Sequence, residues 1–202
     1  IDRGPDSKGV IDLIWKLQKQ GLQIKCIKGN HEDYCIKAYE AEFNRKSFLG
    51  IKSKNLPYED WKRHGAKETL YSFDVQKNFK TFPKEYIDWM KNLNHFVSLD
   101  NFLLVHAGFN FKIDNIFEDT HAMMWIRSFQ PDLKKTRNRK VIHGHVPVSL
   151  EFIELQLNKP EAYPFIALDN GVYMKKKEGF GNLVALEINS MNLVYKEVID
   201  LK

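Results

Sequence analysis

Apolar side chains recur every three or four positions along the first part of the chain. Between Asp6 and Gly21 they stand at Val10, Ile11, Ile14 and Leu17. This period predicts an amphipathic helix that begins after Asp6, which can cap it, and ends at Gly21. The apolar run 22–27 predicts a short strand, and the polar run 29–32 then forms a loop before a second helix over residues 33–43.

The middle of the chain lacks a sustained period. Residues 45–82 are rich in Lys, Gly and aromatic side chains, with only short periodic pieces, which indicates an irregular cap or insertion rather than a separate domain. Pro83 then begins a helix that is predicted to run to about Leu93.

The pattern in the second half of the chain predicts mainly β structure. The runs 96–99 and 102–105 flank Asp100-Asn101 and predict a tight hairpin. Further strands are predicted over residues 141–142, 165–168, 183–188 and 193–198, the last two joined by a turn. His, Asp and Asn residues stand repeatedly at strand ends, where loops can converge on one rim of a sheet. We therefore expect one α/β domain over residues 1–202.

Composition narrows the class of partner. A hydrophobic fraction of 43% fits a globular domain, and the formal charge of +5 favours anionic partners such as phosphorylated substrates. The lysine clusters at 134–140 and 175–177 read as solvated loops without an aromatic ladder, so a nucleic acid is not expected. Two cysteines are too few for a disulfide framework, which favours a cytoplasmic location. No apolar run reaches the ~18 residues of a membrane span, so no membrane partner is expected.

Three residues fit a two-metal hydrolase. Such a site needs His, Asn or Asp ligands on separate loops, so that two cations lie close together and share a hydroxide. Asn30, His106 and His145 meet this need, and each is followed or preceded closely by glycine, which lets the backbone turn sharply near a metal.

Four motifs in order then carry a resemblance. Asp2-Arg3-Gly4, Gly29-Asn30-His31-Glu32, His106-Ala107-Gly108 and Gly144-His145 follow the order found in the phosphoprotein phosphatases, a branch of the calcineurin-like metallophosphoesterases. The resemblance spans about residues 1–171 and is nearest to the small bacterial and phage-type serine/threonine protein phosphatases. It implies a β-sandwich flanked by α-helices in four layers, α/β/β/α.

The resemblance also implies roles for these residues. Asn30, His106 and His145 would bind the second metal, and His31 would be the general acid that protonates the leaving alkoxide after in-line attack by a metal-bridging hydroxide. Asp2 would orient His31, because a carboxylate partner fixes the tautomer of an imidazole and favours its protonated form. The cofactors would be two divalent cations, with Mn²⁺ expected and iron or zinc also compatible with such ligands.

The resemblance also implies which side chains bind the phosphate. Arg3 and Arg127 resemble the arginines that clamp phosphate oxygens in this family, and Asn30 would contact the phosphate as well as the metal. A guanidinium suits this task because its planar fork donates two bonds to one oxyanion. Arg127 lies in Trp125-Ile126-Arg127, which is similar to a Trp-x-Arg element of the small members.

Each residue also has a plainer interpretation. His31 could cap the following helix, His106 could be a satisfied histidine at a strand end, and Asp2-Arg3 could be a local ion pair; the ordered set at loop mouths favours the site. His143 is expected to be structural, since two residues before His145 it should lie deeper in the fold. No motif supports a role for the other histidines, His64, His95 and His121. Asp169-Asn170-Gly171 should shape the site without binding metal.

One departure from the family pattern concerns the start of the chain. The family's opening Asp-x-His element and its bridging Asp would stand before Ile1. We therefore expect a fragment that lacks its first strand and loop and is nearly inactive alone, although the full-length protein would be an enzyme.

The sequence leaves more than one class of substrate possible. Gly144-His145-Val146-Pro147 lacks a second histidine two residues after the first, which favours hydrolysis of phosphomonoesters in a phosphorylated protein or a small phosphoester. A symmetrical dinucleoside tetraphosphatase is the first alternative. The second is a non-catalytic module that binds phosphorylated or nucleic-acid partners.

Overall fold

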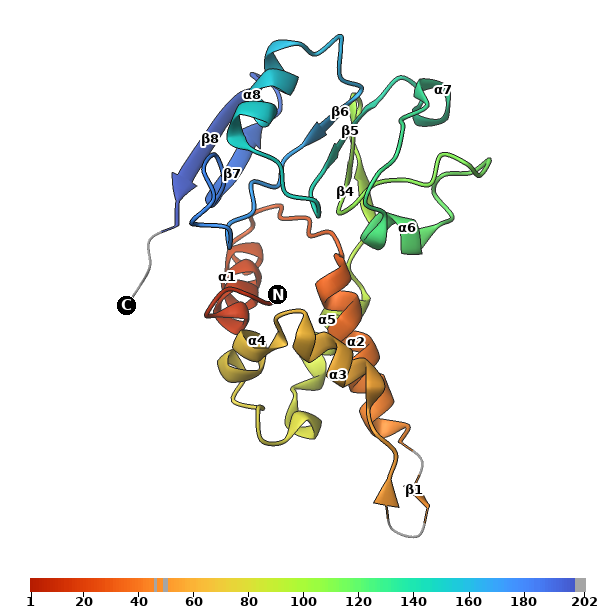
Figure 1. Cartoon of the computed structure of the whole chain (residues 1–202), viewed down its shortest axis with the longest axis vertical. Helices are drawn as coiled ribbons and strands as arrows, with labels where there is room; N and C mark the ends of the chain where they lie inside the picture. The colour runs from red at the N-terminus through yellow and green to blue at the C-terminus, as the bar shows by residue number, and fades with distance from the viewer. Residues whose placement is uncertain (46, 49–50, 199–202) are drawn as a thin grey trace. The chain divides into compact units, whose positions relative to one another are not determined.

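The computed structural model describes residues 1–45, 47–48 and 51–198, and the chain divides into two compact units, residues 1–94 and 95–202 (Figure 1). The first unit is helical, whereas the second contains the longer strands. The mixed α/β class predicted from the sequence is confirmed, while the four-layer arrangement stays a prediction. The single domain with an insertion at residues 45–82 also stays a prediction.

Helices make up most of the first unit. They are α1 (Ser7–Lys19), α2 (Asn30–Phe43), α3 (Leu56–Arg63), α4 (Ala66–Ser72) and α5 (Lys84–Lys91), with the 3₁₀ turn η1 (Phe79–Thr81) and the short strands β1 (Ser47–Phe48) and β2 (Ile51–Lys52). Helix α2 packs against α3 and α5, and α1 packs against α4. Every one of these α-helices contributes buried apolar side chains to one core, which fixes the position of the residues between them.

The first predicted helix is confirmed as α1. The Asp6 carboxylate accepts a hydrogen bond of 2.8 Å from the Gly9 N–H, and Gly21 follows the helix in a left-handed conformation with φ +91°. The predicted strand over 22–27 is wrong: within it only Ile27 forms a β-bridge, to Asn94. An apolar run becomes a strand only beside a hydrogen-bonded partner strand, and the described part of this unit places none along residues 22–26.

Helix α2 begins earlier than predicted. It starts at Asn30 rather than Asp33, because the Glu32 carboxylate accepts a hydrogen bond of 2.9 Å from the Gly29 N–H and so caps the helix one turn earlier. Asn30 and His31 therefore lie in the first turn of a helix, not in the loop before it.

Two helices occupy the segment that was expected to be irregular. Asn55 caps α3 through a 2.9 Å bond from the Tyr58 N–H, and Gly65, with φ +107°, separates α3 from α4. The prediction of irregular structure is wrong there because helices of 8 and 7 residues are too short to show a sustained period.

The second unit is built on a four-stranded sheet. Its strands lie in the order β3 (Phe96–Ser98), β4 (Phe102–Val105), β5 (Lys140–His143) and β6 (Phe165–Ala167). Strands β3 and β4 are antiparallel, which confirms the predicted hairpin, whereas β4, β5 and β6 are parallel. Val105 pairs with His143 at the carboxyl ends of β4 and β5, so the residues that follow both strands emerge at one edge of the sheet.

The rest of this unit, as far as the structure describes it, consists of three helices and a second sheet. It contains the helices α6 (Thr120–Trp125), α7 (Leu133–Thr136) and α8 (Leu150–Asn158), which the hydrophobic pattern did not predict. Strands β7 (Asn182–Glu187) and β8 (Asn192–Glu197) form a separate antiparallel sheet, which confirms the predicted pair. Within the described ranges, no helix has both the length and the apolar character needed to cross a bilayer.

Candidate active site

Asp2 and Arg3 form a tight turn with an unusual backbone. Both residues are left-handed, with φ +75° and +62°, and the Gly4 N–H donates back to the Asp2 carbonyl over 2.7 Å. A left-handed conformation is uncommon for a residue with a side chain, so neighbouring groups must hold it in place. The Asp2 N–H donates to the hydroxyls of Ser7 at 3.1 Å and Thr69 at 2.9 Å, and these contacts fix the turn.

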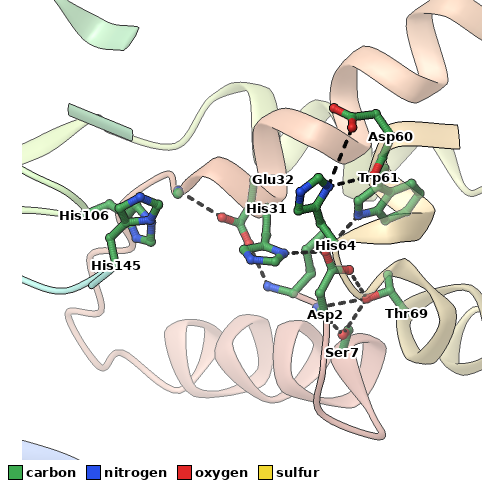
Figure 2. A network of polar contacts seen from close by, with 12 residues as sticks. Asp2, Ser7, His31, Glu32, Asp60, Trp61, His64, Thr69, His106 and His145 are labelled. Carbon is green, nitrogen blue, oxygen red and sulfur yellow. Dashed lines mark hydrogen bonds and ion pairs between the residues drawn. The ribbon is translucent and has the colours of Figure 1, made fainter. Parts of the chain in front are cut away.

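The turn presents the Asp2 carboxylate to His31. The distance from Asp2 Oδ2 to His31 Nδ1 is 2.6 Å, with the imidazole as donor; the Asp2 side chain is fully buried, and that of His31 is 16% exposed. Since Nδ1 is occupied by the carboxylate, Nε2 is the nitrogen left for a substrate (Figure 2). This is the geometry that a positioned general acid requires.

Other side chains complete the bonding of this carboxylate. Trp61 Nε1 donates to Asp2 Oδ2 over 2.8 Å, and Thr69 Oγ1 donates to Asp2 Oδ1 over 2.6 Å. The Ser7 and Thr69 hydroxyls are also hydrogen-bonded to each other at 2.9 Å. Together with His31, these donors give both oxygens of the buried carboxylate a hydrogen-bond partner.

The loop before α2 is held in place by hydrogen bonds from Lys28. Lys28 is buried, its ammonium donates to the Lys91 carbonyl over 2.7 Å, and its backbone N–H donates to the Asn94 carbonyl over 2.8 Å. Burial lowers the pKa of the Lys28 ammonium. These contacts fix the loop that delivers Asn30, itself buried, and His31 at the positive end of the α2 dipole, where an anionic substrate is favoured.

The second unit brings His106 and His145 together. His106 Nε2 and His145 Nδ1 are 3.1 Å apart, and the ring centroids are separated by 5.0 Å. His106 directly follows β4 and His145 stands two residues after β5, and the loops are joined by a 2.8 Å bond from the Gly144 N–H to the His106 carbonyl. His145 adopts a left-handed conformation, φ +70°, that turns it back toward His106.

This pair fits the binding of one cation. Two nitrogens that each lie about 2.0 to 2.1 Å from a metal are separated by roughly 2.9 to 3.4 Å for tetrahedral to octahedral angles, which includes the observed 3.1 Å. The residues that the structure describes include no group of three or more His, Cys, Asp or Glu side chains placed to hold a metal. A complete ligand set with Asn30 therefore stays a prediction.

Residues near the histidine pair support its geometry. The Asn170 amide donates to the carbonyls of Val148 at 3.0 Å and Gly179 at 2.8 Å and accepts from the Asn182 N–H, which braces the segment after His145. His143 packs against Phe129 and Phe165, and burial lowers the pKa of its imidazole. The structural roles expected for His143 and for Asp169-Asn170-Gly171 stay predictions.

Arg3 and Arg127 are the two remaining residues that the sequence predicts for the site. The Arg3 N–H donates to the Gly65 carbonyl at 3.3 Å, so Arg3 belongs to the same turn as Asp2. Arg127 is exposed and follows α6 in the second unit. Their phosphate contacts stay predictions.

Sequence reasoning missed several residues around Asp2 and His31. Trp61, Thr69 and Ser7 bind the carboxylate or its turn, and His64 stacks on Tyr34 with ring centroids 4.8 Å apart. Tyr34 in turn meets His31 edge to face at 6.2 Å. The one signal available beforehand was a tryptophan in a polar segment, since a buried indole N–H needs an acceptor.

Comparison with known proteins supplies the family. The family model described as calcineurin-like phosphoesterase matches residues 1–174 of the 202. No curated protein and no solved structure matches the chain. Members of this family hydrolyse phosphoesters and generally bind two divalent metals. The chain belongs to the calcineurin-like phosphoesterase family.

Proposed function

We propose that this protein is a phosphoprotein phosphatase that removes phosphate from phosphoserine and phosphothreonine, with His31 as the general acid. The observation that carries the proposal is the 2.6 Å contact between His31 Nδ1 and a fully buried Asp2 carboxylate at the start of α2. The leaving group of a serine or threonine phosphate is an alkoxide, which leaves slowly unless it is protonated as the P–O bond breaks. A histidine whose second nitrogen is fixed by a carboxylate is suited to supply that proton.

The chemistry divides among the chain's own residues. Asp2 fixes the ring of His31 so that Nε2 carries the proton to the leaving oxygen. Arg3 and Arg127 neutralise phosphoryl oxygens, and Asn30 would hold both phosphate and metal. His106 and His145 would hold a divalent cation, which supplies Lewis-acid stabilisation and activates water when bound.

Two sequence features favour a phosphomonoester. The segment after Gly144-His145 continues Val146-Pro147 without a second histidine, and the Asp of Asp2-Arg3-Gly4 is retained together with Asn30-His31-Glu32.

We propose a four-layer α/β/β/α arrangement, Mn²⁺ as the activating cation and a cytoplasmic phosphoprotein as the substrate.

The test compares substrates and one variant. The protein as its gene encodes it is assayed with added Mn²⁺ on a phosphoserine peptide and on a symmetrical dinucleoside tetraphosphate. We expect Mn²⁺-dependent release of phosphate from the peptide, reduced about a hundredfold or more by His31→Ala, because general acid catalysis contributes about 10²- to 10⁴-fold. His121→Ala is the matched control, since His121 is an exposed histidine stacked on Trp125 and outside the proposed site.

Each other outcome has a definite meaning. Faster turnover of the dinucleotide would replace the proposal with the dinucleoside tetraphosphatase. Binding of phosphopeptide without turnover of either substrate would replace it with the non-catalytic module. Equal losses in His31→Ala and His121→Ala would show that His31 is not the acid.

A further inference from the structure

The Asp2 carboxylate is bonded from three sides by side chains of different elements. His31 comes from α2, Trp61 from α3 and Thr69 from α4, at 2.6, 2.8 and 2.6 Å from the carboxylate oxygens (Figure 2). Trp61 and His31 share Oδ2, whereas Thr69 occupies Oδ1. The carboxylate therefore cannot rotate about its last bond without breaking contacts at both oxygens.

The donors themselves are held in place. Trp61 and Thr69 are both fully buried, and the indole of Trp61 lies beside Phe79 with ring centroids 5.6 Å apart. The indole has a single N–H donor, which is bonded to Asp2 Oδ2, and burial of the ring holds it in that direction.

The hydroxyl of Thr69 has a defined role as well. It accepts from the Asp2 N–H at 2.9 Å and lies 2.9 Å from the Ser7 hydroxyl, while its own hydrogen points to Asp2 Oδ1. With Ser7 as donor, every polar atom in this buried group is satisfied by one arrangement of hydrogens. A network with a single consistent arrangement orients its members more firmly than any one contact would.

We propose that Trp61 and Thr69 are positioning residues that lock the Asp2 carboxylate onto His31 Nδ1, so that Nδ1 keeps its hydrogen toward Asp2 and the second proton, which the acid form of the ring carries, lies on Nε2. The inference rests on the proposed function, because it assigns the purpose of the network to proton delivery. Neither residue touches the substrate; both act through Asp2.

The test uses two esters that differ in their need for an acid. An alkyl phosphate such as phosphoserine requires protonation of its leaving group, whereas p-nitrophenolate leaves readily without it. We expect Trp61→Phe and Thr69→Val each to lower kcat on a phosphoserine peptide by about tenfold or more while changing kcat on p-nitrophenyl phosphate by less than about threefold, with KM unchanged. Thr69→Ser retains the hydroxyl and should restore most of the loss.

Matched controls make the same chemical changes elsewhere in this unit. Trp15→Phe alters a tryptophan that stacks on Tyr86 at 4.6 Å, and Thr81→Val alters a hydroxyl bonded to the Asn78 carbonyl at 2.7 Å. Both should leave the ratio of the two rates as in the wild type. Equal losses on both esters in Trp61→Phe and Thr69→Val would show a merely structural role and overturn the inference.

A second measurement does not depend on turnover. The ¹⁵N shifts of His31, recorded where its imidazole is neutral, report which nitrogen carries the proton. The Nδ1–H form should dominate in the wild type and lose population in the double variant Trp61→Phe/Thr69→Val. An unchanged tautomer there would overturn the inference even if the protein is a phosphatase. Absence of turnover on any phosphoester, with the tautomer shift present, would instead overturn the proposed function and leave the positioning role standing.

Discussion

Replacing Asp2 by Asn separates the charge of this residue from its shape. The amide fits the same space, and Asn tolerates the left-handed φ of +75° about as well as Asp does. Its oxygen can stay at the position that His31 and Trp61 share, where two N–H donors need an acceptor. The NH₂ group then faces Thr69, whose hydroxyl must turn away.

The effect on stability follows from two opposing terms. Two hydrogen bonds to a charged acceptor become bonds to a neutral one, and the third is reversed so that the amide donates to Thr69 Oγ1, which costs roughly 1 kcal/mol each, while removal of a buried charge returns several kcal/mol of desolvation free energy. These nearly cancel, so the unfolding free energy of Asp2→Asn should lie within about 1 kcal/mol of the wild type. Asp2→Ala should instead lose about 2 to 4 kcal/mol, because it leaves the Trp61 indole N–H buried without an acceptor and keeps a left-handed backbone that Ala disfavours.

The effect on catalysis should be much larger than that on stability. Asp2→Asn leaves His31 without its charged partner, and we expect kcat on a phosphoserine peptide to fall about a hundredfold, which corresponds to about 2.7 kcal/mol of activation free energy. The assay pairs initial rates with urea unfolding followed by far-UV circular dichroism. Wild-type kcat in Asp2→Asn, or wild-type stability in Asp2→Ala, would refute this reasoning.

Three further outcomes test other parts of the chain. His106→Ala and His145→Ala should each weaken Mn²⁺ binding at least tenfold in a calorimetric titration, since each removes one of two imidazoles that lie 3.1 Å apart, and unchanged binding would remove them from the metal site. Bonds from the Ala122 N–H and the Asn110 amide lower the pKa of the Asp119 carboxyl, so its contribution to stability is present above its unfolded pKa of about 4 and is lost as the pH falls through the lower folded value. Asp119→Ala should therefore cost about 1 kcal/mol at pH 7 and less in strong acid, where the neutral carboxyl is the weaker acceptor, and a pH-independent difference would contradict this. Gly108→Ala should destabilise the fold by about 1 to 3 kcal/mol in thermal unfolding, because the added carbon would lie 2.3 Å from the Phe129 ring, and wild-type stability would show that Phe129 can move away.

The sequence predicted those parts of the fold whose signal is local. The period of α1, its capping Asp6 and its terminal Gly21 all lie within one stretch, and the hairpin of β3 and β4 is marked by Asp100-Asn101 between apolar runs. The run 22–27 has the composition of a strand, yet a strand also needs a neighbour, and that information does not reside in the run itself. The start of α2 was misplaced although its signal is local, since the Glu32 carboxylate caps the Gly29 N–H three residues earlier and includes Asn30 and His31 in the helix.

The candidate site shows the same division between local and distant information. Asp2, His31, His106 and His145 could be named because each stands within two residues of a glycine in a motif. Trp61 and Thr69 could not, because they lie in helices too short to show a period and because their partner, Asp2, is about 60 residues away in sequence. Motifs identify the groups that meet a substrate, since their chemistry limits the choice of residue. The groups that orient them need only supply a hydrogen-bond donor at one point in space, which many sequences can do. Reactive residues can therefore be predicted from a sequence more readily than the residues that position them. In this chain, the buried donors to Asp2 are the residues that the sequence did not predict.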